Sequence, residues 1–121
     1  MKKLKEIKKK LADDWFKSLQ EKMIDQFQLI ENEISKKNKI KAKCFVKREW
    51  KKNNKKEGGG ISFILSNGEI FDKLGVNQST VSGQFKKAYR SKILGAEKSG
   101  KYWASGISVV AHMKNPKIPA F

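Results

Sequence analysis

A long helical period, followed by a sharp change of period, limits what this chain can fold into. Between residues 3 and 35 the apolar side chains recur at intervals of three or four. They are Leu4, Ile7, Leu11, Trp15, Leu19, Met23, Phe27, Ile30 and Ile34. This spacing predicts one amphipathic helix of nearly 50 Å, at about 1.5 Å per residue. Phe16, Ile24 and Leu29 widen the apolar stripe, which favours packing on a sheet, with a coiled coil as the alternative.

After Lys39 the apolar period shortens to two, which is the period of a half-buried strand. We therefore expect a strand over residues 39–50. Its apolar positions are Ile40, Ala42, Cys44, Val46 and Trp50. A polar loop over 51–57 leads to a second strand over 61–65. The Asn67-Gly68 pair is typical of a tight hairpin, and it predicts a returning strand at 69–71.

The rest of the chain is less regular until its last strand. Residues 72–83 are rich in turn-forming and small polar residues, and we interpret them as a loop with a short strand. A short helix is expected over 85–94, a loop over 95–100 and a final strand over 103–112. One helix followed by an antiparallel sheet makes the predicted fold class α+β, in a single domain of residues 1–121.

The charge of the chain raises the question of a polyanionic partner. Lysine and arginine number 28 against 12 acidic residues, for a net charge of +16. Only Arg48 and Arg90 are arginines, whereas base readout and bidentate phosphate binding favour the guanidinium group. We therefore expect no nucleic-acid partner. A lysine-rich nucleic-acid-binding module stays open as an alternative, as does a structural protein that oligomerises through the long helix.

Cellular location is constrained by three negative features. No apolar run approaches the roughly 20 residues of a spanning helix, so we expect no membrane span. The N-terminus lacks the apolar segment and cleavage site of a secretory signal. The single Cys44 excludes an internal disulfide and fits a reducing compartment, so we expect a cytoplasmic protein with a buried thiol at this position.

Two groups of residues are candidates for chemistry. Gly58-Gly59-Gly60 is either a loop that approaches a ligand with its backbone or a flexible turn. Ser108 and His112 lie four residues apart in the final strand, so both side chains point to one face, with Val110 between them. A separation of about 13 Å prevents direct proton transfer, and the pair is expected to line an elongated pocket instead. One histidine and one cysteine far apart give no metal-ligand spacing.

Several blocks of the chain resemble the oxygen-dependent coproporphyrinogen III oxidase family of haem biosynthesis. The blocks are residues 45–50, 58–62, 68–83, 102–108 and 112–119. They carry a Gly-Val-Asn-x-Ser-x-Val-x-Gly run and a His-x-x-Asn-Pro-x-x-Pro run, joined by a Trp-Ala-Ser-Gly strand. The resemblance covers nearly all of this chain and only the N-terminal part of the family's longer sequence.

The resemblance implies a fold and a reaction. Members form a large antiparallel sheet flanked by helices and act as soluble homodimers. They convert two propionates of coproporphyrinogen III to vinyl groups, with dioxygen as co-substrate and no organic cofactor, and yield protoporphyrinogen IX. By position, Ser108 matches a substrate-contacting serine. His112 matches a pocket histidine for which a divalent metal has been proposed.

The chain departs from the family pattern at its end. In the family, a His-x-Asn-x-Arg run follows the second proline, and its histidine is the assigned proton donor. Here the sequence ends at Phe121 before that run, so we expect no catalytic residue among these 121 positions. We interpret the chain as a truncated oxidase that is inactive alone.

Overall fold

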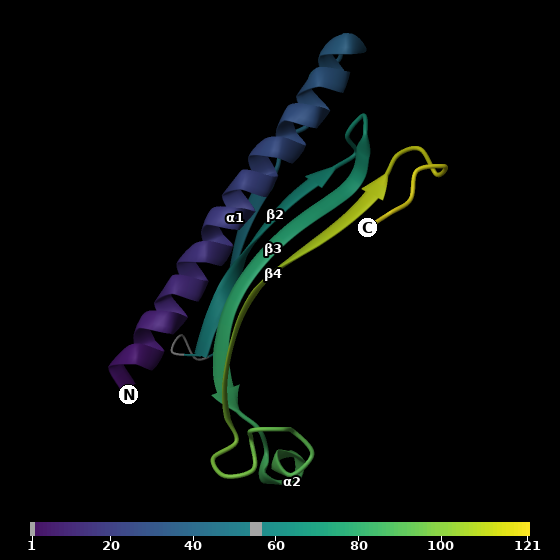
Figure 1. The fold of residues 1–121 in the computed structure, drawn as a ribbon. Helices are drawn as coiled ribbons and strands as arrows, with labels where there is room; N and C mark the ends of the chain where they lie inside the picture. The colour runs from purple at the N-terminus through teal and green to yellow at the C-terminus, as the bar shows by residue number, and fades with distance from the viewer. Residues whose placement is uncertain (1, 54–56) are drawn as a thin grey trace.

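The computed structural model describes residues 2–53 and 57–121, which form a helix and a four-stranded sheet (Figure 1). The elements are α1 (Lys2–Lys37), β1 (Val46–Lys51), β2 (Gly58–Ser66), β3 (Phe71–Gln84), α2 (Lys87–Arg90) and β4 (Lys101–Met113). Helix α1 runs along one face of the sheet, and no other described helix covers the opposite face. We call that opposite surface the open face. The predicted α+β class is confirmed.

The sheet is a meander in which each strand pairs with the next one along the chain. The order is β1-β2-β3-β4 and every pair is antiparallel. Strand β4 begins two residues earlier and ends one residue later than predicted, and α1 is longer by one residue at its start and two at its end. Both differences are of the size expected for element boundaries.

The first predicted strand is too long at its start. Residues 39–45 are not in a strand, and the side chain of Gln28 on α1 binds two backbone groups near the end of this segment. Its amide nitrogen donates to the Lys43 carbonyl (2.8 Å) and its oxygen accepts from the Phe45 N–H (3.3 Å). The predicted buried thiol is also wrong, since Cys44 in this segment is exposed.

Strand β1 lies at the edge of the sheet, and all six of its residues are exposed. The side chains of Val46 and Trp50 keep 59% and 42% of their surface accessible, because they lie on the open face. The alternation of apolar and polar residues therefore identified one face of the strand correctly and its burial wrongly.

The glycine run is part of a strand, and it is neither the ligand-approaching loop nor the flexible turn that the sequence suggested. Gly58, Gly59 and Gly60 begin β2 and pair with β3, and Gly59 and Gly60 also pair with β1. A Cβ atom at Gly59 would overlap the Trp50 carbonyl, so this glycine permits close approach of two backbones. Residues 54–56 of the predicted loop over 51–57 lie outside the described residues.

The hairpin between β2 and β3 turns two residues later than the Asn67-Gly68 pair predicts. Asn67 has a positive φ of 56°, yet the innermost backbone bond joins Gly68 N–H to Phe71 C=O (2.8 Å), so the tip lies two residues later. The Glu31 carboxylate of α1 explains the shift. It accepts hydrogen bonds from the backbone N–H groups of residues 69, 70 and 71 and lies where a Gly68 side chain would be.

The segment 72–83, predicted as a loop with a short strand, belongs to the 14-residue strand β3. Local turn propensity is overridden here because β2 and β4 bind its backbone on both sides. Helix α2, predicted over 85–94, is limited to four residues. The core lies between α1 and the part of the sheet that contains the end of β2, the start of β3 and the end of β4. There Phe27 packs edge-on against Phe71, with 5.5 Å between the ring centroids.

The side chains of α1 that are most deeply buried are polar. They are Gln20, Glu31 and Ser35. The first four side chains of the predicted apolar stripe, Leu4, Ile7, Leu11 and Trp15, stay exposed, and Leu11 among them is 63% exposed. The stripe therefore packs on the sheet as predicted only in its second half. No described helix is long and apolar enough to cross a membrane.

Candidate functional site

The structure places Ser108 and His112 on the open face of the sheet, as the strand period predicts. Both side chains are exposed, and Val110 lies between them on the same face. The alternate residues Val109 and Ala111 face α1 and join or border the core. No irregularity interrupts β4 between the two candidates, since the single register shift against β3 lies at Phe71/Lys73.

A row of polar residues crosses the open face at the level of Ser108. Ser108 pairs with Asn77 on β3, Asn77 with Ser62 on β2, and Ser62 with Arg48 on β1. Paired residues of neighbouring strands point to the same face. We call these four residues the polar row. It spans three strand spacings, which is about 14 Å.

Apolar and small residues border the polar row on both sides. The row toward the C-terminus of β4 holds Val46, Ile64, Gly75 and Val110. The row on the other side holds Trp50, Gly60, Ser79 and Gly106. The indole of Trp50 covers Gly60, where a Cβ would lie within 2.8 Å of the indole nitrogen. The open face therefore offers a surface with apolar and small residues on its flanks and a polar centre.

A cavity of ≈ 300 Å³ lies beside His112. Its lining comprises Ile64, Lys73, Gly75, Asn77, Val110 and His112. Lys73 pairs with His112 across the β3–β4 ladder, so both side chains lie on the open face and line the same cavity. Ser108 does not line this cavity, so the two residues do not share it as the predicted elongated pocket requires. Ser108 lies in the adjoining polar row.

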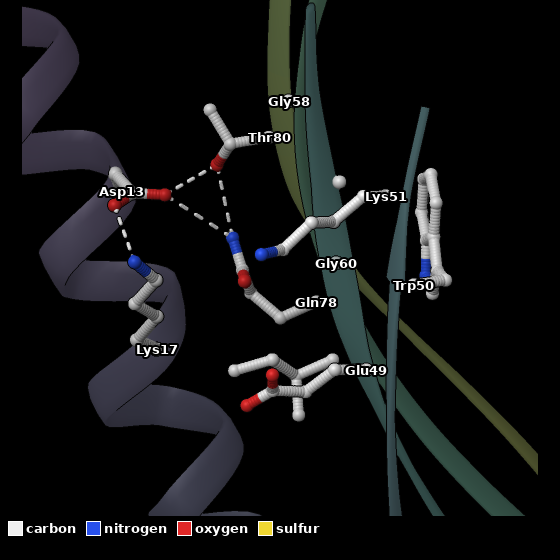
Figure 2. A pocket seen from close by; sticks show the side chains of 11 residues that line it. Asp13, Lys17, Glu49, Trp50, Lys51, Gly58, Gly60, Gln78 and Thr80 are labelled. Carbon is white, nitrogen blue, oxygen red and sulfur yellow. Dashed lines mark hydrogen bonds and ion pairs between the residues drawn. The ribbon is translucent and has the colours of Figure 1, made fainter. Parts of the chain in front are cut away.

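A second cavity, of ≈ 440 Å³, lies on the α1 side of the sheet (Figure 2). It is bounded by α1 on one side and by the start of β2 and the middle of β3 on the other. Asp13 of α1 forms an ion pair with Lys17 (2.8 Å) and accepts hydrogen bonds from Thr80 and from the amide of Gln78 (3.4 Å). Gln78 also donates to the Thr80 hydroxyl at 3.0 Å, and its side chain is 2% exposed. Ser105 on β4 completes this network, 2.8 Å from Thr80.

The Asp13 network connects the helix to the sheet. Because the Asp13 carboxylate is engaged in this network, it is not a candidate for a catalytic base. Partial burial raises the pKa of Asp13, but the hydrogen bonds from Lys17 and Thr80 and the Lys17 charge outweigh it. The pKa therefore lies below its ordinary value of 3.8. An aspartate in this state is ionised at neutral pH, and both of its oxygens are engaged.

The described residues do not form a metal cage. No three His, Cys, Asp or Glu side chains gather within the ranges 2–53 and 57–121. His112 contributes one imidazole, and the adjoining Lys73 ammonium would repel a cation. A divalent metal does not fit the residues present here, so no chemical step is derived through one.

Sequence reasoning missed most of the polar row. Ser62 lacks any local signal that separates it from turn or surface residues, and Arg48 is one of 28 basic residues in the chain. Their place follows from strand register over separations of tens of residues. The Gly-Val-Asn motif that contains Asn77 was the one signal that pointed to this position.

A sheet face with a polar centre, apolar flanks and bordering cations is typical of a site for a ligand that carries anionic groups around an apolar body. The comparisons with known proteins identify the family. The family model described as coproporphyrinogen III oxidase matches residues 11–121. The chain therefore belongs to the coproporphyrinogen III oxidase family.

Curated relatives are similar over most of the chain. The oxygen-dependent coproporphyrinogen-III oxidases of Rickettsia typhi and Rickettsia prowazekii are each 45% identical to it over 113 residues. That of Rickettsia felis is 45% identical over 112 residues. Each alignment covers 93% of this chain and 39% of the relative, so the chain spans about two-fifths of the length of these proteins.

Proposed function

We propose that this chain supplies the sheet surface on which coproporphyrinogen III lies in an oxygen-dependent oxidase. The observation that carries the proposal is the polar row Arg48–Ser62–Asn77–Ser108 on the open face. The row is comparable in breadth with a tetrapyrrole, and its apolar borders suit the macrocycle. Membership of the family supports the choice of ligand.

Carboxylates taken out of water require charged or hydrogen-bonding partners. Among the described strand residues, register places two cations on the open face: Arg48 within the polar row and Lys73 opposite His112. We propose that these two cations bind propionates of the substrate and that Ser108 forms a hydrogen bond with the substrate. Lys47 and Lys51 point to the α1 side of β1 and receive no such role.

The reaction proposed for the complete enzyme is oxidative. Each of two propionates loses carbon dioxide and transfers two electrons and two protons to dioxygen, which leaves a vinyl group and hydrogen peroxide. In this chain the contribution is binding and orientation. We propose His112 as a pocket residue beside the bound ring, and as one metal ligand only where other ligands are supplied from outside the described residues.

Substrate binding tests the proposal most directly. Coproporphyrin III, the stable oxidised analogue, serves as probe, and its fluorescence reports the dissociation constant. Arg48→Ala and Ser108→Ala are each expected to weaken binding, by about tenfold for the arginine, because a charge-assisted hydrogen bond contributes roughly 1.5–3 kcal/mol.

Lys47→Ala is the matched control for charge. It removes a cation from the neighbouring position of β1, on the opposite face of the sheet. Its dissociation constant should stay within about twofold of that of the unchanged chain. Equal weakening by Lys47→Ala and Arg48→Ala would show non-specific attraction to a net charge of +16 and would contradict the proposed site.

The dimeric state and the cytoplasmic location expected from the sequence remain part of the proposal. Sedimentation of the complete enzyme at micromolar concentration tests the first, with a twofold monomer mass as the expected result. Cell fractionation with an antibody to this chain tests the second.

A further inference from the structure

The first half of helix α1 has an apolar face that is directed away from the sheet. Leu4, Ile7, Leu11 and Trp15 follow one another at intervals of three, four and four residues, so they form one stripe along the helix. Their exposed fractions are 52%, 48%, 63% and 55%. We call these four residues the outer stripe. A contiguous row of large exposed apolar side chains marks a site of interaction with a protein or a membrane.

The contacts of neighbouring residues show which way the outer stripe points. Lys9 lies over the Trp103 ring of β4, 5.8 Å from its centroid, and Asp13 binds Thr80 of β3, so both side chains face the sheet. Leu11 is two residues from each of them. At about 100° per residue this separation places Leu11 on the opposite side of the helix. In Figure 1 that is the side of α1 that faces away from the strands.

Cations surround the outer stripe. Six of the first ten residues of the chain are lysines, and one is acidic. Lys8 and Lys3 flank the stripe, at about 60° on one side of its centre line and about 90° on the other. At the end of the stripe the Lys22 ammonium lies 5.9 Å from the centroid of the Trp15 ring. Any occupant of this face therefore meets an apolar ridge with positive charge along both sides.

An anionic bilayer surface fits this arrangement. A helix with leucine and tryptophan on one face and lysine beside them lies in the plane of a membrane surface. Its apolar side chains enter the boundary between headgroups and acyl chains, while the long lysine stems carry their ammonium groups to the phosphates. A second copy of the chain fits less well, because it would bring two lysine-rich helix starts together.

We propose that the outer stripe and the lysines beside it dock the protein onto an anionic phospholipid surface. Helix α1 then lies parallel to the bilayer, and the open face with its polar row points away from the bilayer, because the two lie on opposite sides of the sheet. The contact is peripheral and reversible, so it is compatible with a cytoplasmic protein. It does not depend on which ligand binds the polar row.

Binding of the full chain to vesicles tests the proposal. The vesicles contain phosphatidylcholine alone, or phosphatidylcholine with about one-third phosphatidylglycerol. We expect binding to the anionic vesicles to be at least about tenfold tighter, and to weaken as salt is added. Equal binding to both kinds of vesicle would overturn the proposal.

The apolar contribution is tested by the double variant Ile7→Ser, Leu11→Ser. It should bind anionic vesicles about tenfold more weakly, because two side chains no longer enter the lipid. Leu94→Ser is the control. It removes a leucine that is 97% exposed and lies outside α1, and its binding should stay within about twofold of the unchanged chain. Circular dichroism verifies the helix in each variant. Unchanged binding by the double variant would show attraction to charge alone and would overturn the proposal.

The position of the charge is tested by two double variants of equal net charge. Lys3→Gln with Lys8→Gln removes the cations that flank the outer stripe, whereas Lys36→Gln with Lys37→Gln removes two from the other end of α1. The first pair should weaken binding to anionic vesicles by about tenfold and the second by about twofold. An equal loss in both would mean that the net charge of +16 attracts the lipid without a defined face, which contradicts docking through the outer stripe.

Fluorescence of Trp15 reports whether the outer stripe enters the lipid. In the full chain with Trp50→Phe and Trp103→Phe, Trp15 is the remaining tryptophan. Its emission should shift to shorter wavelength on anionic vesicles and should be quenched by brominated acyl chains. An unshifted and unquenched emission at saturating lipid would overturn the proposal.

Two further results would identify a different occupant and would also overturn it. Sedimentation without lipid would identify a second copy of the chain if it detected a dimer that Ile7→Ser with Leu11→Ser dissociates. Binding of polyglutamate that requires Leu11, together with no binding to vesicles, would identify an acidic protein surface.

Discussion

At the scale of single residues, polar side chains of α1 organise the sheet more than its apolar stripe does. Glu31 is fully buried, and its carboxylate binds three successive backbone N–H groups at the hairpin tip. Gln20 donates to the carbonyls of Ile61 (2.8 Å) and Val76 (3.0 Å), on two neighbouring strands. Each side chain satisfies backbone groups that lie about 40 or more residues away, so each specifies where the helix lies.

Replacement of Glu31 by glutamine should destabilise the fold by about 1–3 kcal/mol. The amide NH₂ group would face backbone donors, and one or more N–H groups would lose an acceptor in a buried place. Urea denaturation followed by circular dichroism measures the change. Glu33→Gln, on the exposed side of the same helix turn, is the control and should change stability by under about 0.5 kcal/mol. A similar loss in both variants would contradict this role of Glu31.

The Asp13 network should make stability depend on acid pH. Because its folded pKa is lowered, the contribution of Asp13 is present above its unfolded value of 3.8 and is lost as the pH falls through the folded pKa. We expect Asp13→Asn to be less stable than the unchanged chain at pH 7, by about 1 kcal/mol. The difference between their urea midpoints should shrink below about pH 4. A difference that stays constant from pH 7 to pH 3 would exclude this linkage.

At the scale of elements, the position of glycines in strands decides how closely β1 and β2 approach. Gly59 lies on β2 opposite Lys51, and a methyl group there would meet the Trp50 carbonyl and the Lys51 Cα, at 2.9 Å from the latter. These are backbone atoms, which cannot move without disturbing the ladder. Gly106 on β4 has open space where its Cβ would lie.

The two glycines therefore predict opposite results for the same substitution. Gly59→Ala should destabilise the chain by about 1–3 kcal/mol, because the overlap forces the strands apart. Gly106→Ala should be neutral or stabilising by up to about 1 kcal/mol, because alanine restricts the unfolded chain. Thermal unfolding of the two variants side by side measures the contrast. Equal effects would show that strand spacing does not depend on Gly59.

At the scale of elements, the sequence pattern predicted a helix or strand correctly where the residues on one of its faces share a single environment. The periods of α1 and of β4 identified both elements and placed Ser108 and His112 on one face. The prediction of 72–83 failed because its turn-forming residues lie in a strand whose backbone is bound from both sides. The Asn67-Gly68 hairpin was misplaced because the Glu31 carboxylate binds the chain two residues later.

At the scale of the whole molecule, the sheet is covered by a helix on one face only in the ranges that the structure describes. The polar row and His112 are therefore open to water. An exposed site gives weak electrostatic interactions and does not hold a substrate away from solvent.

We therefore expect this chain alone to form no vinyl product from coproporphyrinogen III under air. Chromatography of the porphyrins after oxidation measures product, with the Rickettsia typhi oxidase as the positive control. Binding of the coproporphyrin probe without turnover is the expected combination. Vinyl product above the rate of an assay without protein would show that these 121 residues suffice for chemistry.

The sequence by itself determined the helix, most of the strands, the antiparallel order, the family and the common face of Ser108 and His112. These properties depend on local period or on short motifs, so neighbouring residues contain the information. Only the tertiary structure decided that Arg48, Ser62 and Asn77 align with Ser108, that Glu31 reaches the hairpin, and that Phe121 pairs with Ala111 on β4. Each depends on pairing between segments that are distant along the chain, and the free energy of that pairing comes from packing and backbone hydrogen bonds that no local pattern encodes.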